Sequence, residues 1–191
     1  MGANREKERL RAQLLEQRNS LTEAKYRDAS EEIVARLQEL PEIRNARTVH
    51  CYVSMNERRE VDTHLLLRWL LASNKRVVVP VTIIEDMELE HVELQSIDSL
   101  EKNRWGVKEP NGGRNVEPKT LDLVIVPMVG GDLQCNRIGY GKGFYDRFLS
   151  RVDCPTIGLC FDECVVKEIP TESFDIPLSA IVTQQRIIRP G

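Results

Sequence analysis

Apolar positions at helical spacing open the chain. Leu10 and Leu14 fall on one side of residues 4–18, a segment that is otherwise very polar and consists of strong helix formers. Further apolar positions keep the same spacing up to Pro41, behind a Ser-x-x-Glu capping box that begins at Ser20. The pattern predicts two N-terminal amphipathic helices.

Short apolar runs then alternate with helical and polar segments. β-branched and aromatic runs predict strands over residues 48–53, 76–81, 121–126, 156–161 and 180–182, with a possible terminal edge at 186–188. The alternation of residues 87–94 indicates a half-exposed antiparallel or edge strand. Helices are predicted over residues 65–71, capped by Asp62 or Thr63, and over residues 144–152.

This order of elements predicts an α/β fold. We expect a single-domain sandwich over residues 1–191, in which helices flank a mostly parallel, partly mixed central sheet. A ligand site is expected at the carboxyl ends of the strands. Residues 95–119 contain turn chemistry without a sustained period, and a loop of this length is usually functional.

Composition excludes several classes of protein. The 191 residues carry 27 Lys and Arg against 30 Asp and Glu, a net charge of −3, so no basic field attracts nucleic acid or anionic lipid. No apolar run approaches the roughly 18 residues of a membrane span. We therefore expect a cytoplasmic monomer that contacts neither nucleic acid nor membrane and whose partners are small molecules.

The cysteines and histidines add no candidate metal site. Five irregularly spaced cysteines imply no disulfide framework, and we expect buried free thiols. The three histidines lack paired metal-ligand spacing and are given no catalytic role. His50 follows Val49 in a predicted strand and is expected to point outward.

The densest chemical signal is a glycine-rich loop between the strand at residues 121–126 and the helix at 144. Its alternate glycines let backbone N–H groups turn toward an anion, and the helix N-terminus adds a positive dipole end. Lys142 supplies a point charge, Arg137 a forked cation, and Asp146 a carboxylate able to hold Mg²⁺. The loop predicts a phosphate cradle in a nucleotide site.

This loop matches neither common nucleotide fingerprint. Lys142 is followed by Gly143 rather than Ser or Thr, which excludes a P-loop, and Phe144 stands where a dinucleotide fingerprint needs Gly or Ala. A glycine-rich turn that only reverses the chain remains the alternative.

Other candidate residues also have structural readings. Lys7 and Arg11 share one helix face and could simply be solvated. Glu60 could be a loop charge, and Asp62 a helix cap. Trp105 could stack on an aromatic ligand or belong to a local core.

The stretch Arg-Ile-Gly-Tyr-Gly-Lys-Gly-Phe-Tyr-Asp at residues 137–146 closely resembles the signature of the 5-formyltetrahydrofolate cyclo-ligase family, also called 5,10-methenyltetrahydrofolate synthetase. The resemblance runs nearly the length of the chain. It includes the basic motif at residues 7–11, the acidic motif at 60–63, the loop at 106–110 and the strand at 121–127.

The resemblance implies roles for individual residues. ATP, as co-substrate, would be bound by Lys7, Arg11, Arg137, Ile138, Gly139, Tyr140, Gly141, Lys142, Gly143, Phe144 and Tyr145. Lys142, Arg137 and Tyr145 are the expected catalytic residues. Mg²⁺ would be held by Asp146 and, on a looser match, Asp175. Val53, Glu60 and Trp105 are the expected folate contacts, with Glu60 pairing with pterin N–H donors.

The sequence departs from the family pattern at three positions, where Gly131 replaces an aromatic residue, Cys135 replaces glycine, and Ser179 replaces aspartate. It also carries extra residues between Ser54 and Glu60. The implied reaction converts 5-formyltetrahydrofolate and ATP into 5,10-methenyltetrahydrofolate, ADP and phosphate. Two other functions stay open: a non-catalytic nucleotide- or CoA-binding regulator, and an aldose–ketose phosphate isomerase, which needs a carboxylate base and no ATP.

Overall fold

A seven-stranded sheet forms the centre of the computed structural model, which describes residues 3–104 and 106–191. In spatial order its strands are β12 (Ile187–Ile188), β11 (Ala180–Val182), β9 (Thr156–Leu159), β6 (Leu123–Pro127), β1 (Thr48–Cys51), β2 (Arg76–Ile83) and β3 (Glu88–Leu94). The five inner strands are parallel, and the two edge strands, β3 and β12, are antiparallel to their neighbours. The predicted mostly parallel, partly mixed sheet is confirmed.

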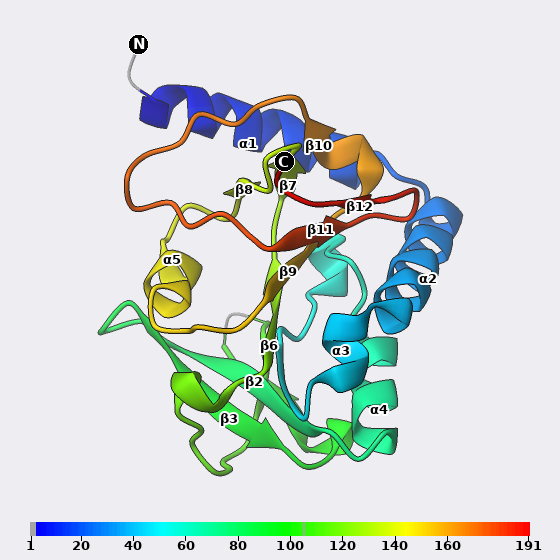
Figure 1. Ribbon diagram of the computed structural model, residues 1–191, viewed down its shortest axis with the longest axis vertical. Coiled ribbons are helices and arrows are strands. Elements are labelled where there is room, and N and C mark those ends of the chain that lie inside the picture. Colours follow the sequence, from blue (N-terminus) through cyan, green and yellow to red (C-terminus); the bar gives the residue numbers. More distant parts are fainter. Residues whose placement is uncertain (1–2, 105) are drawn as a thin grey trace.

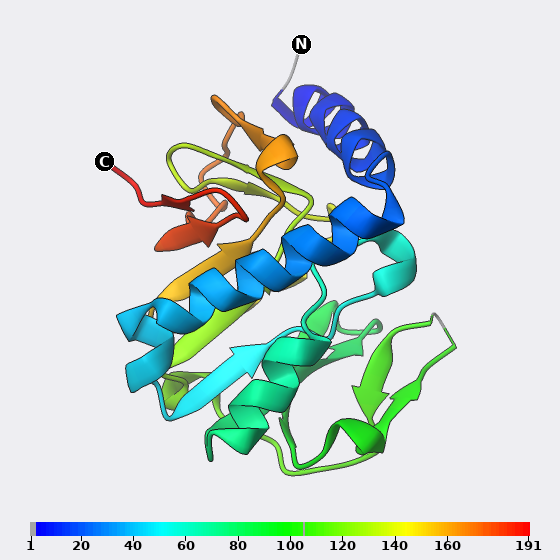
Figure 2. The same ribbon diagram turned by 90° about the vertical axis from the view of Figure 1, so that its right-hand side faces the viewer.

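Helices cover both faces of this sheet (Figure 1). The helices α2 (Glu23–Glu39), α3 (Pro41–Asn45) and α4 (His64–Ala72) lie on one face, where Figure 2 shows α2 and α4 in front of the strands. The short helix α5 (Phe144–Leu149) lies on the other face and contacts β3. Helix α1 (Ala3–Asn19) crosses one end of the molecule. No described helix is long and apolar enough to cross a membrane.

The first three helices begin and end where local chemistry places the boundaries. Thr22, not Ser20, is the N-cap of α2, because its side chain accepts a hydrogen bond from the Lys25 N–H. The capping box predicted at Ser20 is therefore wrong: that hydroxyl donates to the Gln17 carbonyl at the end of α1. Pro41 ends α2 as predicted, but it also starts α3, where the missing N–H of proline costs nothing.

Two small sheets were not predicted. A hairpin of β4 (Leu100–Lys102) and β5 (Lys108–Pro110) forms within the long loop and contacts β2. A second sheet joins β7 (Gly130–Asp132), β8 (Arg137–Ile138) and β10 (Val165–Val166) beneath the glycine loop. The buried Asp132 carboxylate holds it by accepting hydrogen bonds from the Gln134, Asn136 and Ile169 N–H groups.

One cluster of buried apolar side chains extends from Leu14 to Ile188. It includes four of the five cysteines, all of which are free, as predicted. The prediction for His50 is wrong, because its side chain is fully buried between β1 and α5, against His91 and Phe148. The ring centroid of His91 lies 4.1 Å from that of Phe148. The strands β1 and β3 therefore contact α5 through a cluster of tilted rings.

Acidification is expected to destabilise the protein through these two rings. Burial lowers the pKa of His91 to about 4, helped by the charge of Arg151, and lowers the pKa of His50 well below its usual range. The unfolded chain binds protons at higher pH than the folded one, so this stability is complete above about pH 6.5 and is lost as the pH falls toward 4. One such histidine costs about 2 kcal/mol between pH 6.5 and pH 5.

Urea unfolding of the wild type and His91→Leu at both pH values measures this effect. The variant is expected to lose less stability on acidification, while the carboxylates contribute equally to both proteins. Equal losses in the two proteins would show that His91 does not carry the effect.

Candidate active site

A cavity of about 570 Å³ opens at the carboxyl ends of β1 and β6, as the fold predicts. It is lined by helix α1, the glycine loop, residues 172–175, the segment after β1, strand β2 and strand β5. All eleven residues expected to bind ATP line this cavity, as do Val53, Glu60, Asp146 and Asp175. Trp105 lies outside the described residues.

Helix α1 presents Lys7 and Arg11 to the cavity rather than to solvent. Lys7 is 8% exposed, its ammonium forms a close ion pair with Asp175, and Glu172 lies 3.5 Å away. The Arg11 Nε donates to the Gly139 carbonyl at 2.8 Å. These contacts exclude the solvated-face interpretation of the two cations.

The glycine loop turns tightly over Arg11. Gly141 has φ +81° and Gly143 has φ +69°, a region in which a side chain costs energy. A Cβ on Gly141 would also lie 3.1 Å from the Arg11 guanidinium carbon. The sequence therefore needs glycine here both for the backbone turn and for the cation beneath it.

Arg137 and Lys142, the two cations of the glycine loop, differ in burial and in their partners. The Arg137 guanidinium is buried and donates to the Asp146 carboxylate and the Ile176 carbonyl, both at 2.6 Å. Lys142 is exposed at the cavity wall, and its ammonium forms no hydrogen bond or ion pair with any described residue. Lys142 can therefore meet an anion directly, whereas Arg137 must first exchange a partner.

Helix α5 is shorter than predicted and ends at Leu149 instead of residue 152. In its last turn the Ser150 hydroxyl donates to the Arg147 carbonyl, which competes with further helix. The helix still places Tyr145 at the cavity, beside the ring of His50. The Tyr145 hydroxyl is buried without a hydrogen-bond partner among the described residues, and burial raises its pKa well above the usual value.

A chain of three side chains holds the middle of the cavity. The Arg18 guanidinium donates to the Tyr140 hydroxyl at 2.9 Å, and this hydroxyl donates to Glu60 at 2.5 Å. Glu60 also accepts the Met55 N–H at 2.8 Å. Burial raises the pKa of Glu60, while these hydrogen bonds and the charge of Arg18 act in the opposite direction. Each carboxylate oxygen keeps a lone pair for a ligand donor.

The carboxylates at the cavity suit a divalent cation that shares its coordination with a ligand. No described group of three or more His, Cys, Asp or Glu side chains could coordinate a metal alone. Asp146 and Asp175 both line the cavity, and Mg²⁺ commonly takes one or two carboxylates plus phosphate oxygens. The donor set fits that mode of binding.

Comparison with known proteins agrees with this geometry. Residues 3–184 match the family model described as 5-formyltetrahydrofolate cyclo-ligase family. The chain belongs to this family. A relative named "Probable 5-formyltetrahydrofolate cyclo-ligase" from Schizosaccharomyces pombe is 31% identical, covering 96% of this chain and 97% of its own. The Escherichia coli K12 5-formyltetrahydrofolate cyclo-ligase is also 31% identical, over 90% of this chain and 97% of its own.

Solved structures lead to the same family. The NMR structure of Aquifex aeolicus 5,10-methenyltetrahydrofolate synthetase matches with a TM-score of 0.84 and 32% identity, covering 96% of this chain and 92% of that one. The Mycoplasma pneumoniae 5,10-methenyltetrahydrofolate synthetase has a TM-score of 0.76 at 23% identity, over 93% and 98%, and shares the fold. This cyclo-ligase family member is therefore an enzyme of the ligase class.

The three residues that depart from the cyclo-ligase pattern lie in different surroundings. A Cβ on Gly131 would lie within 2.6 Å of Ile181 and Met128, which fill the space beside it. Cys135 has φ +62°, a conformation that glycine adopts at less cost. Ser179 accepts the Thr156 N–H at 3.1 Å and does not line the cavity, so it is not placed to supply a metal ligand.

Three residues of the site were not predicted from the sequence. Glu172 and Lys108 line the cavity, and Arg18 contacts Tyr140, which lines it. Arg18 lies seven positions after Arg11, so the basic face of α1 continues by one more heptad. That spacing could have identified it. Glu172 and Lys108 come from loops and short strands without a periodic signal.

Arg18 and Glu60 are expected to be energetically coupled in this cyclo-ligase. Arg18→Met leaves a buried carboxylate without its cation, so we expect a loss of about 3 kcal/mol, most of which disappears in Arg18→Met/Glu60→Gln. Urea unfolding of both single variants and the double variant gives the coupling, expected above about 1 kcal/mol.

The exposed pair of Arg27 and Asp28 provides the matched control. Their side chains are 66% and 63% exposed, and the cycle Arg27→Met with Asp28→Asn is expected to give almost no coupling. Additive losses at Arg18 and Glu60 would contradict the proposed chain.

Proposed function

We propose that this protein converts 5-formyltetrahydrofolate and ATP into 5,10-methenyltetrahydrofolate, ADP and phosphate. Family membership supports the reaction. The observation that carries the proposal is that one cavity brings the cations of α1 and of the glycine loop together with the buried carboxylate of Glu60. Both substrates can therefore be held in the same cavity.

The chemistry needs alignment rather than a protein nucleophile. A formamide oxygen is a poor leaving group, so in this route it attacks the γ-phosphorus, and ADP departs with the electrons of the broken P–O bond. N10 then attacks the formyl carbon, loses its proton, and phosphate leaves with the C–O electrons. Positioning and charge neutralisation supply the acceleration in phosphoryl transfer.

The cavity residues divide this work. Lys142 neutralises charge on the transferred phosphoryl group, because its ammonium has no partner to give up among the described residues. Arg11, Lys7 and the loop N–H groups hold the remaining phosphates. Arg137 and Tyr145, the other two proposed catalytic residues, line the same cavity.

The folate end of the cavity holds the second substrate. Glu60 accepts pterin N–H donors, and Val53 packs against the ring. Trp105, which lies outside the described residues, remains a proposed third contact.

Mg²⁺ fits beside the phosphates. Bound there, it would neutralise phosphate charge as a Lewis acid. Asp146 and Asp175 would hold it, and both now pair with cations expected to bind the nucleotide, Arg137 and Lys7. When the phosphates bind the two cations and Mg²⁺ binds the two carboxylates, each of these charged groups exchanges one opposite charge for another.

We further propose a monomeric cytoplasmic enzyme with one domain over residues 1–191, whose substrates are small molecules. The nearly balanced charge and the single buried cluster support this proposal. The molar mass measured by light scattering in solution tests whether the protein is a monomer.

Turnover with Mg-ATP and 5-formyltetrahydrofolate tests the proposed reaction. We expect near-ultraviolet absorbance of the methenyl product, and a fall of at least about 100-fold in kcat/KM for Lys142→Ala, which removes the free cation. Lys119→Ala is the matched control, since Lys119 is exposed outside the cavity. ATP binding without product would favour the non-catalytic regulator, and isomerisation of a sugar phosphate without ATP would favour the isomerase.

Metal dependence tests the two carboxylates. Chelation of Mg²⁺ is expected to abolish turnover, and Asp146→Asn and Asp175→Asn each to raise the half-saturating Mg²⁺ concentration about tenfold. Asp153→Asn, at an exposed position outside the cavity, is the control. Unchanged Mg²⁺ titrations in both variants would remove these residues from the metal site.

A further inference from the structure

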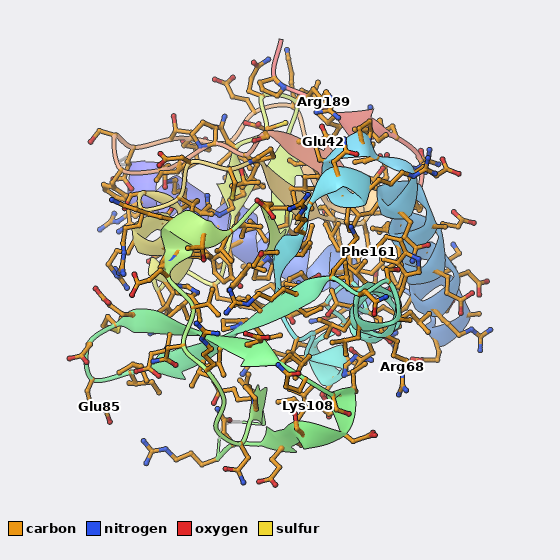
Figure 3. All side chains as sticks on the ribbon, turned by 60° about the horizontal axis from the view of Figure 1, so that its bottom comes forward. Glu42, Arg68, Glu85, Lys108, Phe161 and Arg189 are labelled. Atoms are coloured by element: carbon orange, nitrogen blue, oxygen red, sulfur yellow. The ribbon has the colours of Figure 1, made fainter. Side chains whose placement is uncertain are left out.

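Among the described residues, one lysine of the cavity outside the phosphate loop has no carboxylate partner. This residue is Lys108 on β5, which lines the cavity and is labelled in Figure 3. Among the described residues its ammonium has one hydrogen-bond partner, Nε2 of His64, at 3.4 Å. Lys7 in the same cavity, by contrast, is neutralised by Asp175.

The structure holds this ammonium in place through His64. Nδ1 of His64 lies 2.8 Å from the Asp62 carboxylate, which also accepts the Asn56 side-chain amide at 2.9 Å. Burial raises the pKa of Asp62, but the hydrogen bonds from His64 and Asn56 outweigh it and lower the pKa below its usual value. An ionised Asp62 makes Nδ1 the donor, which leaves Nε2 to accept from Lys108.

The ammonium therefore has two N–H donors left for a ligand. The nearby carboxylate of Glu57 is already paired with Lys102 at 2.6 Å. A cation on a cavity wall without an internal counter-charge favours an anionic group of the ligand.

The proposed substrate carries such a group. Folate has its donors on the pterin and its carboxylates on the glutamate at the opposite end, with a flat aromatic ring between them. Glu60 would hold the pterin, and the apolar side chains of Pro80, Leu89 and Val107, which line the same cavity as Glu60 and Lys108, suit this ring.

We propose that Lys108, positioned by His64 and Asp62, binds a glutamate carboxylate of the folate substrate. This inference rests on the proposed function and assigns the acidic end of the folate, for which the proposed function names no contact.

Substrates with and without glutamate test the subsite in Lys108→Met. For 5-formyltetrahydrofolate we expect KM to rise about tenfold while kcat and the KM for ATP stay within twofold. For 5-formyltetrahydropteroate, which lacks glutamate, wild type and variant should have the same KM. Lys108→Arg should retain most of the affinity, and His64→Leu should give a smaller rise in the same KM.

Lys102→Met is the matched control, because it removes a lysine of the same hairpin that pairs with Glu57 and does not line the cavity. An unchanged folate KM in Lys108→Met, or an equal rise with both substrates, would overturn the proposal. A rise in the KM for ATP instead would assign Lys108 to the nucleotide.

Direct binding separates this inference from the proposed reaction. The Kd of 5-formyltetrahydrofolate, measured by calorimetry, should rise about tenfold in Lys108→Met even if the wild type shows no turnover. Failure of turnover with this binding difference intact would overturn the reaction and leave the subsite. Turnover with equal Kd values would overturn the subsite alone.

Discussion

Compensation of buried charge organises this molecule. Lys7 pairs with Asp175, Arg137 with Asp146, and Arg18 reaches Glu60 through Tyr140. Each connection joins a cation to a carboxylate in another element. Two of the cations, Lys7 and Arg18, belong to α1. Lys7 contacts Asp175 near the C-terminus, and Arg18 reaches Glu60 in the loop after β1. Removing one partner would leave an unpaired buried charge. We therefore expect the loss of any one of these side chains to destabilise the cavity.

The same pairing suits the two anionic ligands that we propose for the cavity. Carboxylates that neutralise Lys7 and Arg137 in the free protein are the groups proposed to hold Mg²⁺ when phosphates arrive, so partners exchange without an uncompensated charge. Lys142 and Lys108 both line the cavity and have no carboxylate partner among the described residues. We propose that they provide the net attraction for the reacting phosphate and for the glutamate of the folate.

Local patterns predicted the sheet, the loop and the basic face of α1, because periodicity and glycine spacing are properties of neighbouring residues. Long-range contacts were not predictable: nothing near Arg18 in the sequence shows that it reaches Tyr140. His50 was misplaced because alternation along one short strand does not say which face α5 covers. The hairpin that carries Lys108 has three-residue strands, too short for a period to appear.

The central claim is that one cavity aligns the formyl oxygen with the γ-phosphorus for direct attack. An isotope measurement tests it: 5-formyltetrahydrofolate labelled with ¹⁸O in the formyl group is converted with Mg-ATP, and the released phosphate is analysed by mass spectrometry. The account predicts that the label appears in inorganic phosphate, one atom for each methenyl product formed. Unlabelled phosphate, with the ¹⁸O found in water, would contradict it.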